Sequence, residues 1–313
     1  MELHLYRNGA GSRVAFIAAR FGRMASLQNT FSVFFTCRFR QQPIACGIML
    51  HAVEHIRRMR GGAQAHLMRC DDNSYYVVKF QNNPQHTRVL ANEVLGTVLA
   101  GRLGLPTLPF AVVEVRQDLI RLTDDLVMQV GLSRTPCKAG LQFGSRYPGD
   151  PAETTVFDYL PDETLAEIEN REDFLGMLVF DKWTCNTNGR QTVFFREPGR
   201  SQYQTTMIDQ GFCFNAGEWN FPDAPLRGLY SRGRVYTAVS AMSSFDRWIT
   251  RLEKQISTDD LDVAAKQIPP EWYGFDMDAL YALLERLERR RPQVRAQIEQ
   301  ARDSSRQPFP NWR

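Results

Sequence analysis

Residues 178–195 read LVFDKWTCNTNGRQTVFF, and this stretch decides how the rest of the chain is interpreted. An apolar run with helical character ends here in a polar loop, and a β-prone run, residues 192–195, follows at once. Short polar loops between a rigid helix and a rigid strand are where catalytic groups are often placed. The sequence therefore predicts a functional loop, whose candidate catalytic residues are Asp181, Asn186, Asn188 and Arg190.

A second polar turn follows a little further along the chain. Residues 205–208 read as a short strand, and Asp209-Gln210-Gly211 closes it. The glycine permits a sharp turn directly after a carboxylate at a strand end. As neighbours, the two loops would bring carboxamides, a cation and a carboxylate together, which is a set that suits a metal-bound phosphate.

The composition is that of an ordinary globular protein. The 313 residues are enough for one large domain or two lobes, and the net charge of +3 gives no reason to expect direct nucleic-acid binding. The six cysteines include no C-x-x-C pair and no cysteine–histidine cluster, so we expect no zinc site and free thiols in a reducing cytosol. The free thiols predict a cytoplasmic protein. No run of 18 apolar residues is present, so we expect no transmembrane helix.

Residues 1–48 differ in composition from the remainder. They contain six arginines, no lysine and a single acidic residue, Glu2, with little periodicity. Such a segment is either an arginine-rich targeting or nucleic-acid arm or a poorly ordered extension. We favour the poorly ordered basic extension, and we expect the folded part to begin at Met49.

From residue 49 the pattern becomes regular and rich in strand signals. Residues 71–74 mark a turn, and residues 75–80, YYVVKF, predict a strong strand that contains Lys79. A lysine in such a strand usually faces solvent. The alternative is a phosphate-binding lysine beneath a loop that contains Gly61 and Gly62.

Residues 87–103 predict a helix, because their apolar side chains fall on one broad face. Gly104 and Pro106 end it. Glu93 lies within this helix. It is either an ordinary surface residue or the partner that orients Lys79.

The remaining pattern predicts an α+β protein with two lobes. Strands are expected at residues 110–115, 119–122 and 141–147, and the Pro- and Gly-rich residues 147–153 mark the best boundary. The second half is mainly helical, with helices expected near residues 161–163 and over 171–183, 235–251 and 277–294. We therefore predict a β-rich lobe at 49–146, a helical lobe at 147–306 and a frayed tail at 307–313.

Several of these pieces, in this order, resemble the HipA-like kinases, which are bacterial relatives of protein kinases. The pieces are RGGAQAHL at 60–67, VKF at 78–80, NE at 92–93, FGS at 143–145, NTN at 186–188 and IDQG at 208–211. The resemblance covers roughly residues 49–298. No single motif is decisive; their order and separations carry the resemblance.

The resemblance implies a bilobal protein-kinase-like fold and binding of ATP with Mg²⁺. It implies that backbone N–H groups of a glycine loop cover the phosphates, and that Lys79 contacts them with Glu93 as its partner. It also implies that a linker near residues 143–145 meets adenine and that Asp209 binds the metal, with Asn186 as a second candidate. The residues assigned in this way to nucleotide binding are Gly61, Gly62, Ala63, Gln64, Lys79, Glu93, Phe143 and Gly144.

One position departs from the family pattern. Asn188 stands where the family motif has its catalytic Asp, and a carboxamide cannot take a proton from a hydroxyl at neutral pH. The metal-binding Asn expected five residues later would fall at Val193 or near Thr192. Asp181 and Asn186 have a kinase-like D-x-x-x-x-N spacing, so Asp181 is an alternative base. The plainer reading is that Asp181 pairs with Lys182 or Arg190.

The leading functional prediction is an ATP-dependent kinase that phosphorylates Ser or Thr of a protein or of its own chain. The alternative is a nucleotide-binding pseudokinase that acts as an interaction module, and a third reading is a structural domain that binds no nucleotide. The expected partners are ATP, an unidentified protein substrate and an antitoxin-like protein, with no membrane association.

Overall fold

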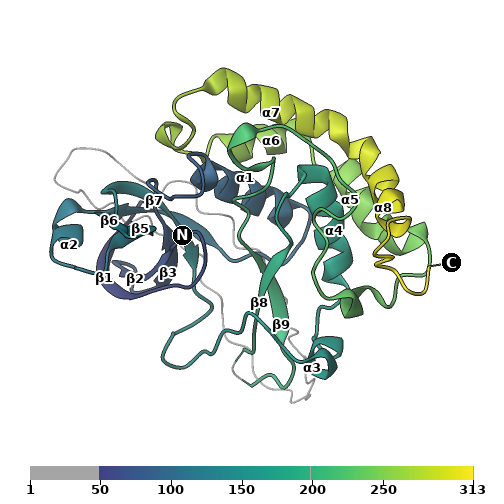
Figure 1. Cartoon of the computed structure of the whole chain (residues 1–313), viewed down its shortest axis with the longest axis horizontal. Coiled ribbons are helices and arrows are strands. Elements are labelled where there is room, and N and C mark those ends of the chain that lie inside the picture. Colours follow the sequence, from purple (N-terminus) through teal and green to yellow (C-terminus); the bar gives the residue numbers. More distant parts are fainter. Residues whose placement is uncertain (1–48, 198, 313) are drawn as a thin grey trace, which may run out of the picture. The chain divides into compact units, whose positions relative to one another are not determined.

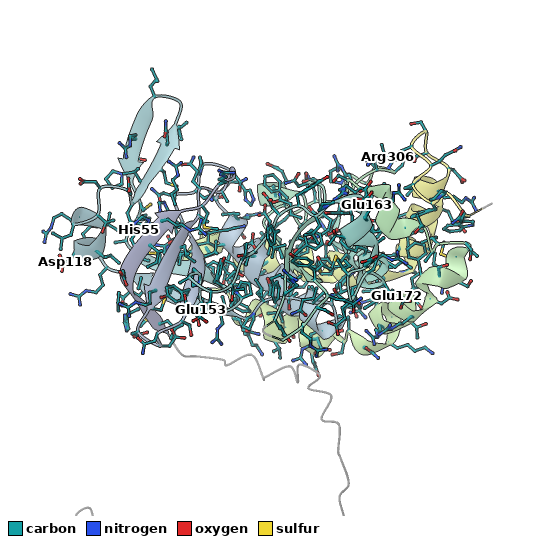
Figure 2. All side chains as sticks on the ribbon, turned by 90° about the horizontal axis from the view of Figure 1, so that it is seen from below. His55, Asp118, Glu153, Glu163, Glu172 and Arg306 are labelled. Carbon is teal, nitrogen blue, oxygen red and sulfur yellow. The ribbon has the colours of Figure 1, made fainter. Side chains whose placement is uncertain are left out.

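The computed structural model describes residues 49–197 and 199–312. The extension predicted at residues 1–48 lies outside the described residues. Two hydrophobic cores organise the described part: a smaller one inside a β-barrel and a larger one among helices. Figure 1 shows the barrel strands gathered apart from helices α4, α5, α7 and α8.

Five strands close into a barrel in the order β1-β2-β3-β7-β4, with a parallel pairing between β1 and β4. Their bounds are Leu50–Arg58 (β1), His66–Cys70 (β2), Tyr75–Lys79 (β3), Phe110–Val115 (β4) and Gly140–Arg146 (β7). Val78 and Phe80 are fully buried in the barrel core. Because side chains alternate along a strand, Lys79 between them points out of the barrel.

Helix α1 (Val89–Arg102) follows β3 in sequence and contributes most of its residues to the larger core. It packs against α6 (Thr258–Ala265) and against β7, so it bridges barrel and helices. The larger core therefore includes an element that precedes the predicted boundary at residue 147. The division into lobes at 146/147 stays a prediction based on composition.

The other helices of the larger core come from the second half of the chain. They are α3 (Asp162–Ala166), α4 (Asp173–Thr184), α5 (Asp246–Gln255), α7 (Met277–Arg290) and α8 (Val294–Arg302). Helix α4 ends at Cys185, whose φ of 49° is left-handed and turns the chain into the polar loop. The hairpin β8 (Gln191–Phe195) and β9 (Gln204–Ile208) follows, and its pairing of Gln191 with Ile208 places Arg190 beside Asp209.

The secondary structure corrects three predictions. Residues 119–122 belong mostly to a short helix, α2 (Gln117–Arg121), of which only Ile120 is buried. Residues 235–245 form two 3-10 turns joined by a loop, and a regular helix begins only at Asp246. Serines in this loop bond locally, as when Ser244 Oγ accepts from Ser240 N–H, and such bonds compete with a helix.

The C-terminal segment is the third correction. Phe309, predicted to lie in a frayed tail, is 3% exposed and packs edge-on against Tyr236 and Phe245. Trp312 contacts Phe309 and lies under the guanidinium of Arg302. Aromatic burial fixes the tail. The sequence also gave no clear signal for α6 or for the hairpin β5 (Val127–Val130) and β6 (Ser133–Pro136).

Candidate active site

Lys79 joins two carboxylates that come from different elements. Its Nζ lies 2.5 Å from Oε1 of Glu93 on α1 and 2.6 Å from Oδ1 of Asp209, which follows β9. The predicted ion pair between Lys79 and Glu93 is thus present. Asp209, which was expected to bind a metal, contacts the same ammonium directly.

Burial and charge act in opposite directions on these three groups. Burial alone would lower the pKa of Lys79, but Glu93 and Asp209 together raise it above its ordinary value. Burial raises the pKa of Glu93, the deepest of the three. Burial would also raise the pKa of Asp209, but Lys79 holds it below its ordinary value. Asp209 is therefore the carboxylate that stays ionised most readily, and its side chain is 16% exposed.

Glu93 also fixes the turn after β9. Its carboxylate accepts the backbone N–H groups of Gln210 (3.1 Å) and Gly211 (2.9 Å) in addition to Lys79. A Cβ at Gly211 would lie 2.6 Å from Cγ2 of Val89, so this close approach of α1 and the turn requires glycine. The turn that carries Asp209 is thereby tied to α1.

The loop after α4 has a different character, because its charges are closed off from solvent. Asp181 and Arg190 have fully buried side chains, and Arg190 donates to both carboxylate oxygens of Asp181. Gly228 closes over this pair, since a Cβ there would lie 2.4 Å from Cβ of Asp181. Asp181 cannot reach a substrate hydroxyl in this structure, so its pairing with Arg190 replaces the interpretation as a general base.

The two asparagines of the loop also have distinct environments. Asn186 is 1% exposed; it donates to Asp181 and its Oδ1 accepts the N–H of Asn188. The role of Asn186 as a second metal ligand stays a prediction, since its Oδ1 accepts one hydrogen bond and has a second lone pair. Asn188 is exposed, and its side chain accepts the N–H of Gly189. Its position facing an acceptor hydroxyl stays a prediction.

The glycine loop between β1 and β2 is held at its ends by polar side chains. Gly61 has a φ of +115°, and open space surrounds it. The carbonyl of Ala63 accepts from the buried Asn83, while the Gln64 carboxamide bonds both the N–H and the carbonyl of Gln129 in β5. The loop adjoins the segment after Lys79, and its contact with phosphates stays a prediction.

The structure places Phe143 and Gly144 in a strand instead of the predicted linker, and their contact with adenine stays a prediction. Both residues lie inside β7, which pairs with β3 on one side and β4 on the other, so the ladder uses their backbone groups. Phe143 is 2% exposed and stacks on Phe110, with ring centroids 5.8 Å apart. A Cβ at Gly144 would lie 2.7 Å from Val113. Any linker between the lobes begins after Arg146.

The residues present fit a magnesium-bound nucleotide at Asp209. The described residues contain no cluster of three His, Cys, Asp or Glu side chains able to hold a metal. Mg²⁺ in phosphoryl-transfer sites needs only one or two carboxylates, because phosphate oxygens and water complete its shell. Asp209 meets this requirement beside the Lys79 ammonium, whereas Val193 and Thr192 lie in β8 and supply no carboxamide.

The sequence suggested no role for the groups that organise the turn, although Asn92 stands beside Glu93 in the motif at 92–93. Asn92 is fully buried and donates to the carbonyls of Gly211 (2.8 Å) and Ala216 (2.8 Å). The side-chain oxygen of Asn92, Oδ1, accepts a hydrogen bond from the indole N–H of Trp219. His86 contacts the Gly211 carbonyl at 2.9 Å, and burial lowers its pKa. A carboxamide in an otherwise apolar helix face was a visible signal, since buried Asn needs partners.

Similarity to known proteins comes from one family model and from solved structures. The described residues include no helix long and apolar enough to cross a membrane. No curated protein matches the chain. The chain is similar to a proinflammatory kinase, CtkA, of Helicobacter pylori, with 13% identity, a TM-score of 0.49 and coverage of 79% of this chain and 99% of that one.

It is also similar to a HipA of Shewanella oneidensis MR-1 solved with HipB and operator DNA, with 12% identity, a TM-score of 0.45 and coverage of 80% of this chain and 68% of that one. Both TM-scores are low, and the family assignment rests on the family model alone. That model, described as HipA-like kinase, matches residues 52–301. The chain therefore belongs to the HipA-like kinases.

Proposed function

We propose that this protein binds ATP with Mg²⁺ and transfers the γ-phosphoryl group to a Ser or Thr hydroxyl of a protein or of its own chain. The observation that carries the proposal is the contact of one buried ammonium, Lys79, with both Glu93 and Asp209. Because the chain belongs to the HipA-like kinases, we also expect an antitoxin-like protein partner and a cytoplasmic location.

The residues have separate roles in this proposal. Lys79 would contact the phosphates, Glu93 would hold its ammonium, and Asp209 would bind the metal. The bound Mg²⁺ would neutralise charge that develops on the phosphate oxygens. Asn188 can orient an acceptor hydroxyl by hydrogen bonding, but it cannot remove the proton. Transfer would therefore depend on positioning and charge, which supply most of the catalysis of this reaction class.

The second candidate is a pseudokinase that binds nucleotide without transferring phosphate. It is favoured by two observations: the described loop exposes a carboxamide at Asn188, and the carboxylate of Asp181 is buried against Arg190. Under this candidate the Lys79 cluster would serve binding alone.

Binding and transfer can be measured separately. Isothermal titration with Mg²⁺ and ADP should show binding by the wild type, weaker binding by Lys79→Met and Asp209→Asn, and unchanged binding by Lys254→Met, an exposed lysine of α5. Wild-type binding with transfer of labelled γ-phosphate supports the kinase, and binding without transfer supports the pseudokinase. Absence of wild-type binding under these conditions would refute both.

A further inference from the structure

Arg190 bonds to three separate parts of the site. Its Nε donates to Asp181 at 2.8 Å, and its Nη2 donates to the other oxygen of the same carboxylate. Its Nη1 donates to the carbonyl of Ile208 (3.0 Å) and to Oε1 of Gln210 (2.8 Å). Ile208 and Gln210 are the immediate neighbours of Asp209, so the guanidinium holds the chain on both sides of that residue.

Gln210 receives a second restraint from the opposite direction. Its side chain bonds Arg190, while its backbone N–H donates to Glu93 on α1. Gln210 is 1% exposed. A Cβ at Gly96 of α1 would lie 2.7 Å from the Cβ of Gln210, so the helix passes close to this side chain. The turn is therefore fixed between α1 on one side and the loop after α4 on the other.

Asp209 needs such restraint because its backbone is left-handed, with a φ of 61°. Residues other than glycine seldom adopt this region, and they remain there only when the surrounding structure fixes them. The same turn places the Asp209 carboxylate 2.6 Å from Lys79. A turn that relaxed to negative φ would move the carboxylate away from the ammonium.

We propose that the buried pair Asp181–Arg190 is a positioning unit: it holds Ile208 and Gln210 so that Asp209 keeps its left-handed backbone and its contact with Lys79. Neither member transfers a proton or touches phosphate. Only the consequence for nucleotide and magnesium rests on the proposed function; the restraint on the turn is a property of the protein alone.

Hydrogen exchange tests the restraint without any nucleotide. The N–H groups of Gln210 and Gly211 are bonded to Glu93, so they should exchange slowly in the wild type. Gln210→Met leaves the Asp181–Arg190 pair intact and removes one acceptor of Arg190. Arg190→Lys keeps a positive charge but removes the planar guanidinium, whose N–H groups bond Asp181 and the turn at the same time. Both variants should speed exchange of these two amides on the order of tenfold, the effect of losing one hydrogen bond to a charged group.

Arg290→Lys is the matched control, because Arg290 is also a buried arginine bound to a carboxylate, Asp223, and to carbonyls at the end of α4. It should lower the unfolding midpoint without specifically affecting the Gln210 and Gly211 amides. Equal exchange of these amides in Gln210→Met and the wild type would overturn the proposal. Equal acceleration in Arg290→Lys would also overturn it, since the effect would then be general loosening.

A second measurement joins the restraint to the site. The ratio of ADP affinities with and without Mg²⁺ should fall on the order of tenfold in Gln210→Met and stay unchanged in Arg290→Lys. An unchanged ratio in a Gln210→Met protein with faster amide exchange would overturn the link to Asp209. A wild type that binds no ADP would refute the proposed function, while the exchange experiment would still decide the positioning role.

Discussion

Replacing Glu93 by Gln should destabilise the protein far more than a change of one oxygen to nitrogen suggests. The carboxylate accepts three donors: the Lys79 ammonium at 2.5 Å, the Gly211 N–H at 2.9 Å and the Gln210 N–H at 3.1 Å. The first two reach Oε1 and the third reaches Oε2. A carboxamide NH₂ cannot accept, so at least one buried donor loses its partner in either amide orientation.

The magnitude follows from those contacts. A hydrogen bond to a charged group contributes about 1.5–3 kcal/mol, and breaking a buried ion pair by removing one partner costs about 3–5 kcal/mol. Lys79 keeps Asp209 as a counter-ion, so the lower part of this range applies. We expect Glu93→Gln to lower the free energy of unfolding by about 2–3 kcal/mol.

Urea unfolding near pH 7.5, followed by circular dichroism, measures this loss. Glu285→Gln provides the control, since Glu285 pairs with Arg289 at the surface and its side chain is 66% exposed. The control should change the free energy of unfolding by less than about 0.5 kcal/mol, as exposed pairs do. A Glu93→Gln protein as stable as the control would refute the assignment of Glu93 as a triply bonded buried carboxylate.

Three further predictions address other parts of the chain. Asn188→Asp should raise γ-phosphate transfer by about 10²–10⁴ if position 188 faces the acceptor, because it adds a general base; an unchanged rate would exclude that placement. His66 is fully buried, and burial, with His55 and Arg58 as further causes, lowers its pKa to about 4 from 6.5. The unfolded chain therefore binds more protons in this range, and the free energy of unfolding should fall by about 2 kcal/mol from about pH 8 to about pH 5 and stay level above about pH 8. Urea midpoints across this range check the fall, which His66→Asn should flatten. Phe309→Ala should lower the free energy of unfolding by about 3–5 kcal/mol in the same assay; a tail that matters little would show no change.

The parts of the site that depend on local pattern could be predicted from the sequence. The strand that contains Lys79 and the helix that contains Glu93 were both predicted, and the two side chains form an ion pair. Both elements are strongly periodic and adjacent in the chain. Local periodicity therefore predicted the two elements, whereas the pairing of the two side chains was implied by the resemblance to the HipA-like kinases.

The burial of Asp181 could not be predicted in this way, although pairing with Arg190 was one of the alternatives that the sequence offered. The spacing between Asp181 and Asn186 resembles a catalytic pair, but spacing does not reveal which side of a helix end a distant loop covers. Gly228, more than forty positions away, closes over Asp181, and Arg190 satisfies it. Similarly, Phe309 contacts Tyr236 and Phe245, which lie more than sixty positions earlier in the chain. Because the local pattern contains no sign of these partners, the sequence predicted a frayed tail.

The two charged clusters differ in net charge: one is neutral, and the other has one more carboxylate than cations. This difference indicates how ligands should bind. Asp181 and Arg190 form a buried pair without net charge, so they have little attraction for a further ion. Lys79, Glu93 and Asp209 combine one cation with two carboxylates, and burial, with the negative charge of Asp209 as a further cause, raises the pKa of Glu93. A polyphosphate that approached alone would compete with Asp209 for Lys79. A divalent cation at Asp209 would remove that competition, so magnesium and nucleotide should bind together more tightly than either alone.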